Sequence, residues 1–203
     1  MIHPDTILRQ INDRIGLGVV VTRPIPRGTI VWLRDALDQV ISPERAAALP
    51  EQVKFHLDLY GYQEDDNIVL LWDNGRFVNH SCQPSTISIG SFAQVARRDL
   101  DPGEEITCEY ADDQYKIPFT CTCGAPGCHG GSPPGPTQAR SVRLDEEAAA
   151  AYASALEVPQ PLLEAAIGNQ PGAWIFRALR DKRPLTLPSS SAPTSLWRDG
   201  PRP

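Results

Sequence analysis

Short apolar, β-branched runs separated by turn residues dominate the first 110 residues of the chain. Residues 18–22 read Gly-Val-Val-Val-Thr, residues 29–32 read Thr-Ile-Val-Trp, and the turn Pro-Ile-Pro-Arg-Gly separates them. Residues 67–72, Asn-Ile-Val-Leu-Leu-Trp, form a further run that ends at Asp-Asn-Gly. The unit of strand, Pro/Gly turn and strand returns between residues 96 and 107. This alternation of apolar runs and turn residues predicts short strands in small sheets, and therefore a mainly β fold.

One helical region is predicted inside this β pattern, between residues 42 and 60. Ser42 is a favourable N-cap because its side-chain oxygen can accept from a backbone N–H of the first turn. Pro43 suits the first helical position, where a backbone N–H has no partner within the helix. We therefore expect the helix to begin at this Ser-Pro pair.

The composition changes after residue 130. Residues 132–136 read Ser-Pro-Pro-Gly-Pro and predict a linker, and helical segments are expected at 145–156, 161–167 and 172–180. Their apolar side chains need a surface on which to dock. These side chains are Leu144, Leu156, Leu162, Leu163, Ile167, Trp174, Ile175 and Leu179. The tail after Pro184 is rich in Pro and Ser, and we expect it to be disordered.

Bulk properties limit the function classes. A chain of 203 residues with 41% hydrophobic residues suits one domain, or one domain with an appendage. No apolar run reaches the length of a membrane span and no signal peptide is visible, so we expect an intracellular protein, cytoplasmic or, in a eukaryote, nuclear. The net charge of −6 argues against direct nucleic-acid binding and suits a basic protein or peptide partner.

Four of the five cysteines form a three-plus-one pattern. Cys121, Cys123 and Cys128 lie within eight residues, and Cys82 lies about forty residues upstream. Three thiolates need one more ligand to complete a tetrahedral zinc site, and Cys82 is the obvious donor. An odd number of cysteines without a signal peptide argues against a disulfide framework, although disulfides or free thiols are the alternatives. His129 is a possible substitute ligand, against the simpler interpretation as a solvated loop histidine.

Three segments, in order, resemble the signature segments of SET-domain protein-lysine N-methyltransferases. They are Gly-Leu-Gly at 16–18, Arg-Phe-Val-Asn-His-Ser-Cys-Gln-Pro at 76–84 and Gly-Glu-Glu-Ile-Thr-Cys-Glu-Tyr at 103–110. The cysteines at 121–128 resemble the family's post-SET zinc module, so the resemblance covers roughly residues 10–130. It implies a SET (β-clip) fold of several small sheets with a knot-like crossing and short helices. It leaves the last third of the chain unexplained, where the pattern after residue 130 predicts a helical C-terminal extension. With that extension, the predicted segments are a SET-like catalytic domain (1–112), a post-SET zinc-binding loop (113–131), the helical extension (132–183) and the disordered tail (184–203).

The resemblance also implies a reaction: methyl transfer from S-adenosylmethionine to a lysine amine on a protein substrate, with Zn²⁺ in the post-SET module. Tyr110 would be the catalytic residue, between the cofactor and the lysine channel. The implied cofactor-binding residues are Gly16, Leu17, Gly18, Asn79, His80 and Tyr110. The implied channel residues are Tyr60, Phe77 and Cys108, the implied zinc ligands are Cys82, Cys121, Cys123 and Cys128, and Phe119 or Thr122 would cover the adenine.

Two residues depart from the family pattern. Cys108 stands where the family usually carries Phe or Tyr, and Ser85 stands where it usually carries Asn. These departures favour an alternative, a catalytically inactive, zinc-stapled SET-like module that binds a peptide. A third alternative is a small metal-binding structural protein without a cofactor. The intact Tyr110 and the Asn79-His80 pair favour the enzyme.

Overall fold

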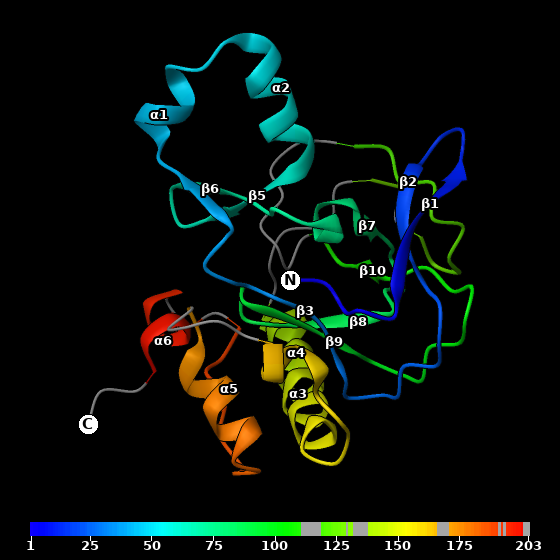
Figure 1. The fold of residues 1–203 in the computed structure, drawn as a ribbon, viewed down its shortest axis with the longest axis vertical. Coiled ribbons are helices and arrows are strands. Elements are labelled where there is room, and N and C mark those ends of the chain that lie inside the picture. Colours follow the sequence, from blue (N-terminus) through cyan, green and yellow to red (C-terminus); the bar gives the residue numbers. More distant parts are fainter. Residues whose placement is uncertain are drawn as a thin grey trace.

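The computed structural model describes residues 1–110, 119–128, 130–131, 138–165, 171–190, 192 and 194–200 (Figure 1). Its strands are β1 (Thr6–Asn12), β2 (Gly16–Val21), β3 (Ile30–Leu33), β4 (Gln39–Ile41), β5 (Gly61–Glu64), β6 (Asn67–Leu70), β7 (Asn79–His80), β8 (Thr86–Ile89), β9 (Ala93–Ala96) and β10 (Thr107–Cys108). Its helices are α1 (Pro43–Ala47), α2 (Glu51–Tyr60), α3 (Gln138–Ala155), α4 (Pro161–Ala165), α5 (Ala173–Arg180), α6 (Thr194–Asp199) and the 3-10 helix η1 (Asn74–Phe77).

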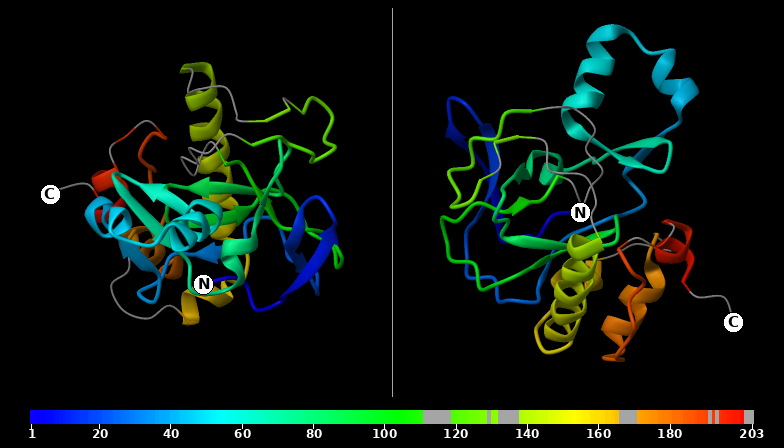
Figure 2. Two further views of the ribbon diagram at one scale, coloured as in Figure 1. Left: turned by 90° about the horizontal axis from the view of Figure 1, so that it is seen from above. Right: turned by 180° about the vertical axis from the view of Figure 1, so that it is seen from behind.

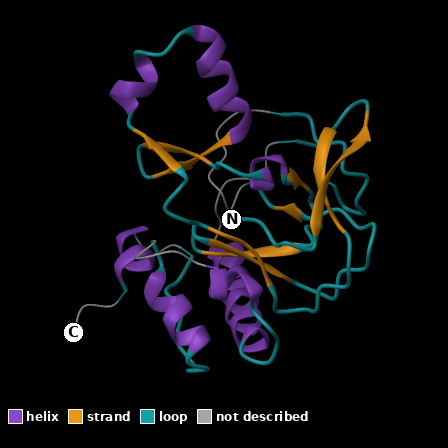
Figure 3. Ribbon diagram, viewed as in Figure 1, coloured by secondary structure: helices purple, strands orange, loops and turns teal. Residues whose placement is uncertain are grey.

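The strands form small sheets, as the turn pattern predicted (Figure 3). Strands β1 and β2 form an antiparallel hairpin, and the sheets β4-β6-β5 and β3-β9-β8 are also antiparallel. Strands β7 and β10 pair in parallel, with Asn79 opposite Thr107 and His80 opposite Cys108. The mainly β fold class is therefore confirmed. The knot-like crossing stays a prediction.

The predicted helix at 42–60 is broken in two. Ser42 caps α1 as expected, since its Oγ accepts from the N–H of Arg45 at 3.3 Å. Pro50 then disfavours the helical conformation at the residue before it, so α1 ends at Ala47 and α2 starts afresh at Glu51. Together with β5 and β6, the two helices form the part drawn at the top of Figure 1.

The C-terminal helices pack against the sheet β3-β9-β8, on the side away from α1 and α2 (Figures 1 and 2). They share one apolar cluster with that sheet, to which the sheet contributes residues such as Ile30, Ile89 and Val95, and the helices Tyr152, Leu162 and Ile175. Helix α3 begins at Gln138, earlier than expected. Ile167, the linker at 132–136 and His129 lie outside the described residues.

The tail differs from the disorder that its composition predicted. Residues Thr194–Asp199 form α6, and Trp197 is only 5% exposed. Its indole packs over Gly90, where a Cβ would lie 2.8 Å from the ring, and its N–H donates to the carbonyl of Ser189 at 3.1 Å. One large aromatic side chain therefore orders a segment whose average composition is polar. The division of the chain into four segments stays a prediction.

Gln160 fastens the extension to the edge of β3. Its Oε1 accepts from the N–H of Ile30 at 2.9 Å, and its Nε2 donates to the carbonyls of Gly28 and Ala155, both at 2.9 Å. Ile30 is fully buried, so its N–H has no access to water. The side chain thus satisfies backbone groups that lie 130 residues away in sequence.

We expect Gln160→Ala to lower the free energy of unfolding by about 2–3 kcal/mol, because a buried N–H is left without an acceptor. Urea denaturation measures the change. Gln52→Ala, at an exposed position on α2, is the matched control and should change stability by less than about 0.5 kcal/mol. Equal effects of the two substitutions would contradict the role given to Gln160.

Candidate active site and metal centre

The parallel pair β7-β10 brings the two longest sequence motifs together. Tyr110 follows β10 directly, and its backbone N–H donates to Nδ1 of His80 at 3.4 Å. The two rings lie 5.4 Å apart between centroids. Phe119 packs against both, at 5.1 Å from His80 and 5.5 Å from Tyr110. Three aromatic residues from distant parts of the sequence thus form one cluster.

His80 links this aromatic cluster to the cysteines. Its Nε2 lies 3.3 Å from Sγ of Cys82, and its Nδ1 lies 3.3 Å from a carboxylate oxygen of Glu109. Nδ1 thus faces both the Tyr110 N–H and the Glu109 carboxylate, and the tautomer of the ring decides which partner donates in the contact with Cys82. The contact between Nε2 and Sγ lets the ring position the sulfur of Cys82 within the cysteine group.

Asn79 joins the first motif to the third. Its Nδ2 donates to the carbonyl of Leu17 at 2.9 Å and to Glu105 Oε1 at 2.7 Å. Burial raises the pKa of Glu105, and the hydrogen bond from Asn79 lowers it in part. A Cβ at Gly18 would lie 2.4 Å from the same carboxylate oxygen and 2.9 Å from Asn79 Nδ2, so this contact requires glycine. By contrast, no atom lies within 4 Å of a Cβ built on Gly16, which leaves open space there.

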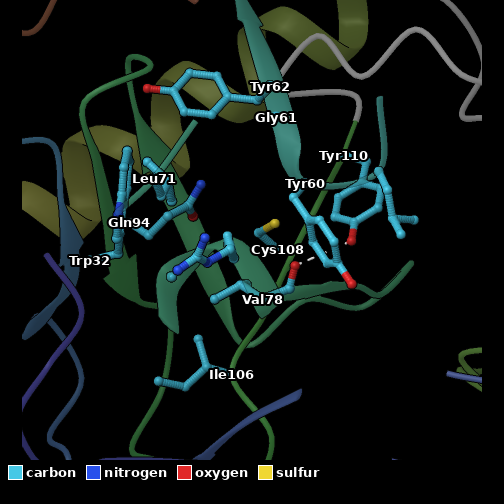
Figure 4. A pocket seen from close by; sticks show the side chains of 13 residues that line it. Trp32, Tyr60, Gly61, Tyr62, Leu71, Val78, Gln94, Ile106, Cys108 and Tyr110 are labelled. Carbon is cyan, nitrogen blue, oxygen red and sulfur yellow. Dashed lines mark hydrogen bonds between the residues drawn. The ribbon is translucent and has the colours of Figure 1, made fainter. Parts of the chain in front are cut away.

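A cavity of about 80 Å³ opens beside these segments (Figure 4). Its walls come from α2, η1 and strands β3, β5, β9 and β10, together with residues that adjoin η1, β6 and β10. The lining residues are Trp32, Leu59, Tyr60, Gly61, Tyr62, Leu71, Gly75, Arg76, Val78, Gln94, Ile106, Cys108 and Tyr110. The hydroxyl of Tyr110 donates to the carbonyl of Val78 at 3.2 Å, on one wall of the cavity.

The channel candidates occupy different places around this cavity. Tyr60 and Cys108 line it. Phe77 lies behind Tyr60, with ring centroids 5.3 Å apart in an edge-to-face arrangement. Sequence reasoning missed Trp32 and other wall residues, because they lie on strands whose apolar patterns are ordinary. Only the pairing of those strands shows that these side chains face one space.

The four cysteines named from their spacing meet at one point. The sulfurs of Cys82, Cys121, Cys123 and Cys128 all lie within 4.8 Å of one another. Cys82 Sγ lies 3.8 Å from that of Cys121 and 3.7 Å from that of Cys128. Four sulfurs at about 2.3 Å from a tetrahedral zinc ion are about 3.8 Å apart, so the arrangement fits that ion. Cys108 lies apart from the group, buried in the cavity wall.

The pKa values of two of the clustered cysteines are shifted in opposite directions. Burial raises the pKa of Cys121 to about 11. At Cys123 burial raises the pKa, whereas hydrogen bonds from the backbone of Cys82 and Ala125 lower it more strongly, to about 6. A loop with one readily ionised thiol and three neighbouring thiols has the chemistry of a cation site.

A SET domain family model matches residues 16–111, which include all three signature segments and the aromatic cluster up to Tyr110. These residues form a SET domain. The prediction made from the motifs is thereby confirmed for this part of the chain.

Known SET-domain proteins align with the chain at modest identity. It is 30% identical over 133 residues to "Variant-silencing SET domain-containing protein" of Plasmodium falciparum, which covers 58% of this chain and 5% of that protein. It is 27% identical over 151 residues to "Putative histone-lysine N-methyltransferase ASHH4" of Arabidopsis thaliana, which covers 66% of this chain and 42% of that protein. The chain therefore spans less than half the length of either relative.

One further relative and one solved structure are similar to part of the chain. The chain is 35% identical over 131 residues to "Histone-lysine N-methyltransferase, H3 lysine-36 specific" of Mycosarcoma maydis, covering 59% of this chain and 14% of that protein. It also resembles the crystal structure of the methyltransferase domain of human SETMAR, with 21% identity and a TM-score of 0.47, over 66% of this chain and 58% of that one. Within the described residues of our chain, no helix combines the length and the apolar character needed to cross a bilayer.

Proposed function

We propose that this SET domain transfers a methyl group from S-adenosylmethionine to a lysine side-chain amine on a protein substrate. One observation carries the proposal. Tyr110, whose hydroxyl donates to the Val78 carbonyl, lines the apolar cavity, and its ring also packs against His80 and Phe119. A lysine channel and a cofactor site need this arrangement, in which one polar group lies between two compartments.

The residues near Gly16 fit the cofactor. Open space lies beside Gly16, Leu17 is 39% exposed, and Asn79 holds the Leu17 carbonyl. Backbone groups of Gly16 to Gly18 would bind the amino-acid end, and Asn79 and His80 the adenosine part. Phe119, which packs on His80, is better placed than Thr122 to cover the adenine. When bound, the cofactor supplies an electrophilic methyl group on a sulfonium sulfur.

The cavity would make the lysine amine a nucleophile. A free lysine has a pKa near 10.4, so it is almost wholly protonated at pH 7. The rings of Tyr60, Tyr110 and Trp32 and the side chain of Ile106 line a mainly apolar site, and burial of the amine there would disfavour the ammonium form. The hydroxyl oxygen of Tyr110 would accept an N–H of the neutral amine and so orient its lone pair. No side chain needs to form a covalent intermediate.

The substrate class follows from charge and from the relatives. The net charge of −6 suits a basic polypeptide, and two of the relatives are named as histone-lysine methyltransferases. We propose a basic protein or peptide, with a histone as the first candidate. Zn²⁺ at the four cysteines would act as a structural ion and would take no part in the transfer.

Two measurements separate this function from its alternatives. Calorimetry with S-adenosylmethionine detects cofactor binding, and mass spectrometry of a lysine-containing peptide library detects transfer. Binding with transfer supports the proposal. Cofactor binding without transfer to any peptide would support the inactive peptide-binding module, which the departure from the family pattern at Cys108 favours. No binding at all would leave the metal-binding structural protein.

A further inference from the structure

The hydroxyl of Tyr62 is held by residues outside its own sheet. Tyr62 lies on β5 and lines the cavity, and its hydroxyl points away from Tyr60 and Tyr110 (Figure 4). The hydroxyl accepts from Arg34 Nη1 at 2.9 Å and donates to the carbonyl of Ser91 at 3.2 Å. Arg34 follows β3, and Ser91 lies in the turn between β8 and β9. The position of this wall residue therefore depends on the neighbouring sheet β3-β9-β8.

A buried polar network ties β5 to the same turn a second time. Arg34 Nη1 also donates to Glu64 Oε1 at 3.1 Å, and Ser91 Oγ donates to that oxygen at 3.4 Å. Arg34 is 3% exposed and Glu64 is 7% exposed. Breaking a buried ion pair is unfavourable, because each charge then loses its partner without gaining water. A displacement of the turn should therefore be passed on to β5, on which Tyr62 lies.

The C-terminal extension holds the other two residues of this turn. A Cβ on Gly90 would lie 2.8 Å from the indole of Trp197, and a Cβ on Gly172 would lie 3.2 Å from Phe92. Because Gly90 has no side chain, the indole packs against the backbone of the turn. The carbonyl of Trp197 accepts from Trp174 Nε1 at 2.8 Å, which fixes the residue within the extension.

We propose that Trp197 is a positioning residue for the transfer: through the turn at 90–92 it holds Tyr62 in the cavity wall, and the extension thereby sets the shape of the site in which the amine is aligned. The inference rests on the proposed function. Among the described residues, none of those that line the cavity belongs to the extension, so Trp197 acts through the contacts of Gly90 and Ser91. The Tyr62 ring also packs edge-to-face on Trp32, with centroids 6.1 Å apart, so its displacement would disturb a second wall residue.

A smaller side chain at position 197 should slow the transfer. Trp197→Phe keeps a ring in the apolar cluster and leaves space over Gly90, so the turn can shift and the hold on Tyr62 weakens. We expect the rate of a single turnover at saturating cofactor and peptide to fall by about tenfold, because a small misplacement of reacting groups is costly. The contacts of Asn79 with Leu17 and Glu105 lie outside this path, so cofactor affinity should be kept.

Fluorine NMR of protein that contains 3-fluorotyrosine tests the path without any transfer. Tyr62→Phe identifies the signal of Tyr62 among those of the five tyrosines. We expect Trp197→Phe to shift or broaden that signal. Leu162→Ala is the matched control, because it also removes buried apolar volume from the extension's side of the same cluster, and it should leave the signal in place. An unchanged Tyr62 signal in a folded Trp197→Phe protein, or an equal change in the control, would overturn the proposal.

A double-mutant cycle tests the consequence for the reaction. Tyr62→Phe removes the hydroxyl through which the turn holds the ring, so the double variant with Trp197→Phe should transfer at the rate of Tyr62→Phe alone. Leu162→Ala should lose stability and keep the parent rate. A parent rate in Trp197→Phe, or two rate losses that multiply in the double variant, would contradict the proposal. If NMR shows the path but the parent protein transfers no methyl group to any peptide, the proposed function fails and the structural link between Trp197 and Tyr62 stands.

Discussion

Replacing Tyr110 by phenylalanine should lower the rate of methyl transfer by about 30- to 1,000-fold, which is about 2–4 kcal/mol in the barrier. The ring packs against His80 and Phe119 whether or not it carries a hydroxyl, so the fold should persist. The hydroxyl, which donates to the Val78 carbonyl, has its effect when the amine and the methyl group are aligned. Its removal therefore destabilises the transition state more than it destabilises the bound ground state.

Single-turnover transfer at saturating cofactor measures the rate, and calorimetry measures cofactor affinity, which should change little. Tyr152→Phe is the matched control. It also removes a hydroxyl that donates a hydrogen bond, to the carbonyl of Arg183 at 2.8 Å, but it lies in the extension. We expect this control to lose stability and to keep its transfer rate. If Tyr110→Phe instead transfers at the parent rate, the next candidates are Tyr60 and Tyr62, which line the same cavity, and Tyr115, which lies outside the described residues.

The sequence predicted those parts of the site that depend on unusual residues in a fixed order. Asn79, His80 and Tyr110 belong to motifs, and the structure brings them together through the parallel pair β7-β10. The four cysteines could be named because three of them lie close together in sequence and a zinc site then needs one more ligand. In each case rare side chains carry the signal, and local sequence was enough to find them. Their catalytic and binding roles stay proposals.

Other features depend on contacts between distant segments. Trp32 reads as an ordinary strand residue, and only its pairing with Gln94 places it in the cavity wall. The order of the tail depends on Trp197 packing over Gly90, which its Pro- and Ser-rich composition conceals. The break between α1 and α2 was readable at Pro50, but the Ser42 signal suggested one longer helix. Composition and periodicity describe whole segments, so they do not show single contacts of this kind.

Removing the metal should release the loop at 119–131 and weaken cofactor binding by at least tenfold, while the sheets persist. None of residues 121–128 is buried, so apolar packing does not hold this loop in place. Among its described contacts with the rest of the chain, Gln83 Nε2 donates to the carbonyl of Pro126 at 2.9 Å. The apolar clusters under the sheets, by contrast, contain no described residue of the loop. Structural zinc binds with a free energy of about 10–16 kcal/mol in small peptides, enough to order a loop of this kind.

Metal analysis of the purified protein should give about one zinc per chain, the value for a single closed tetrahedral site. Cys82→Ser combined with Cys121→Ser should abolish it, and Cys108→Ala, the control outside the cluster, should retain it. Circular dichroism during chelation then separates two roles of the ion. If the sheets and cofactor binding are lost together, the metal holds the whole fold. If cofactor binding is lost while the sheets persist, the ion holds Phe119 and its loop over His80 and Tyr110. Without the ion, Phe119 would move away from these two rings, and β7 and β10 would stay paired.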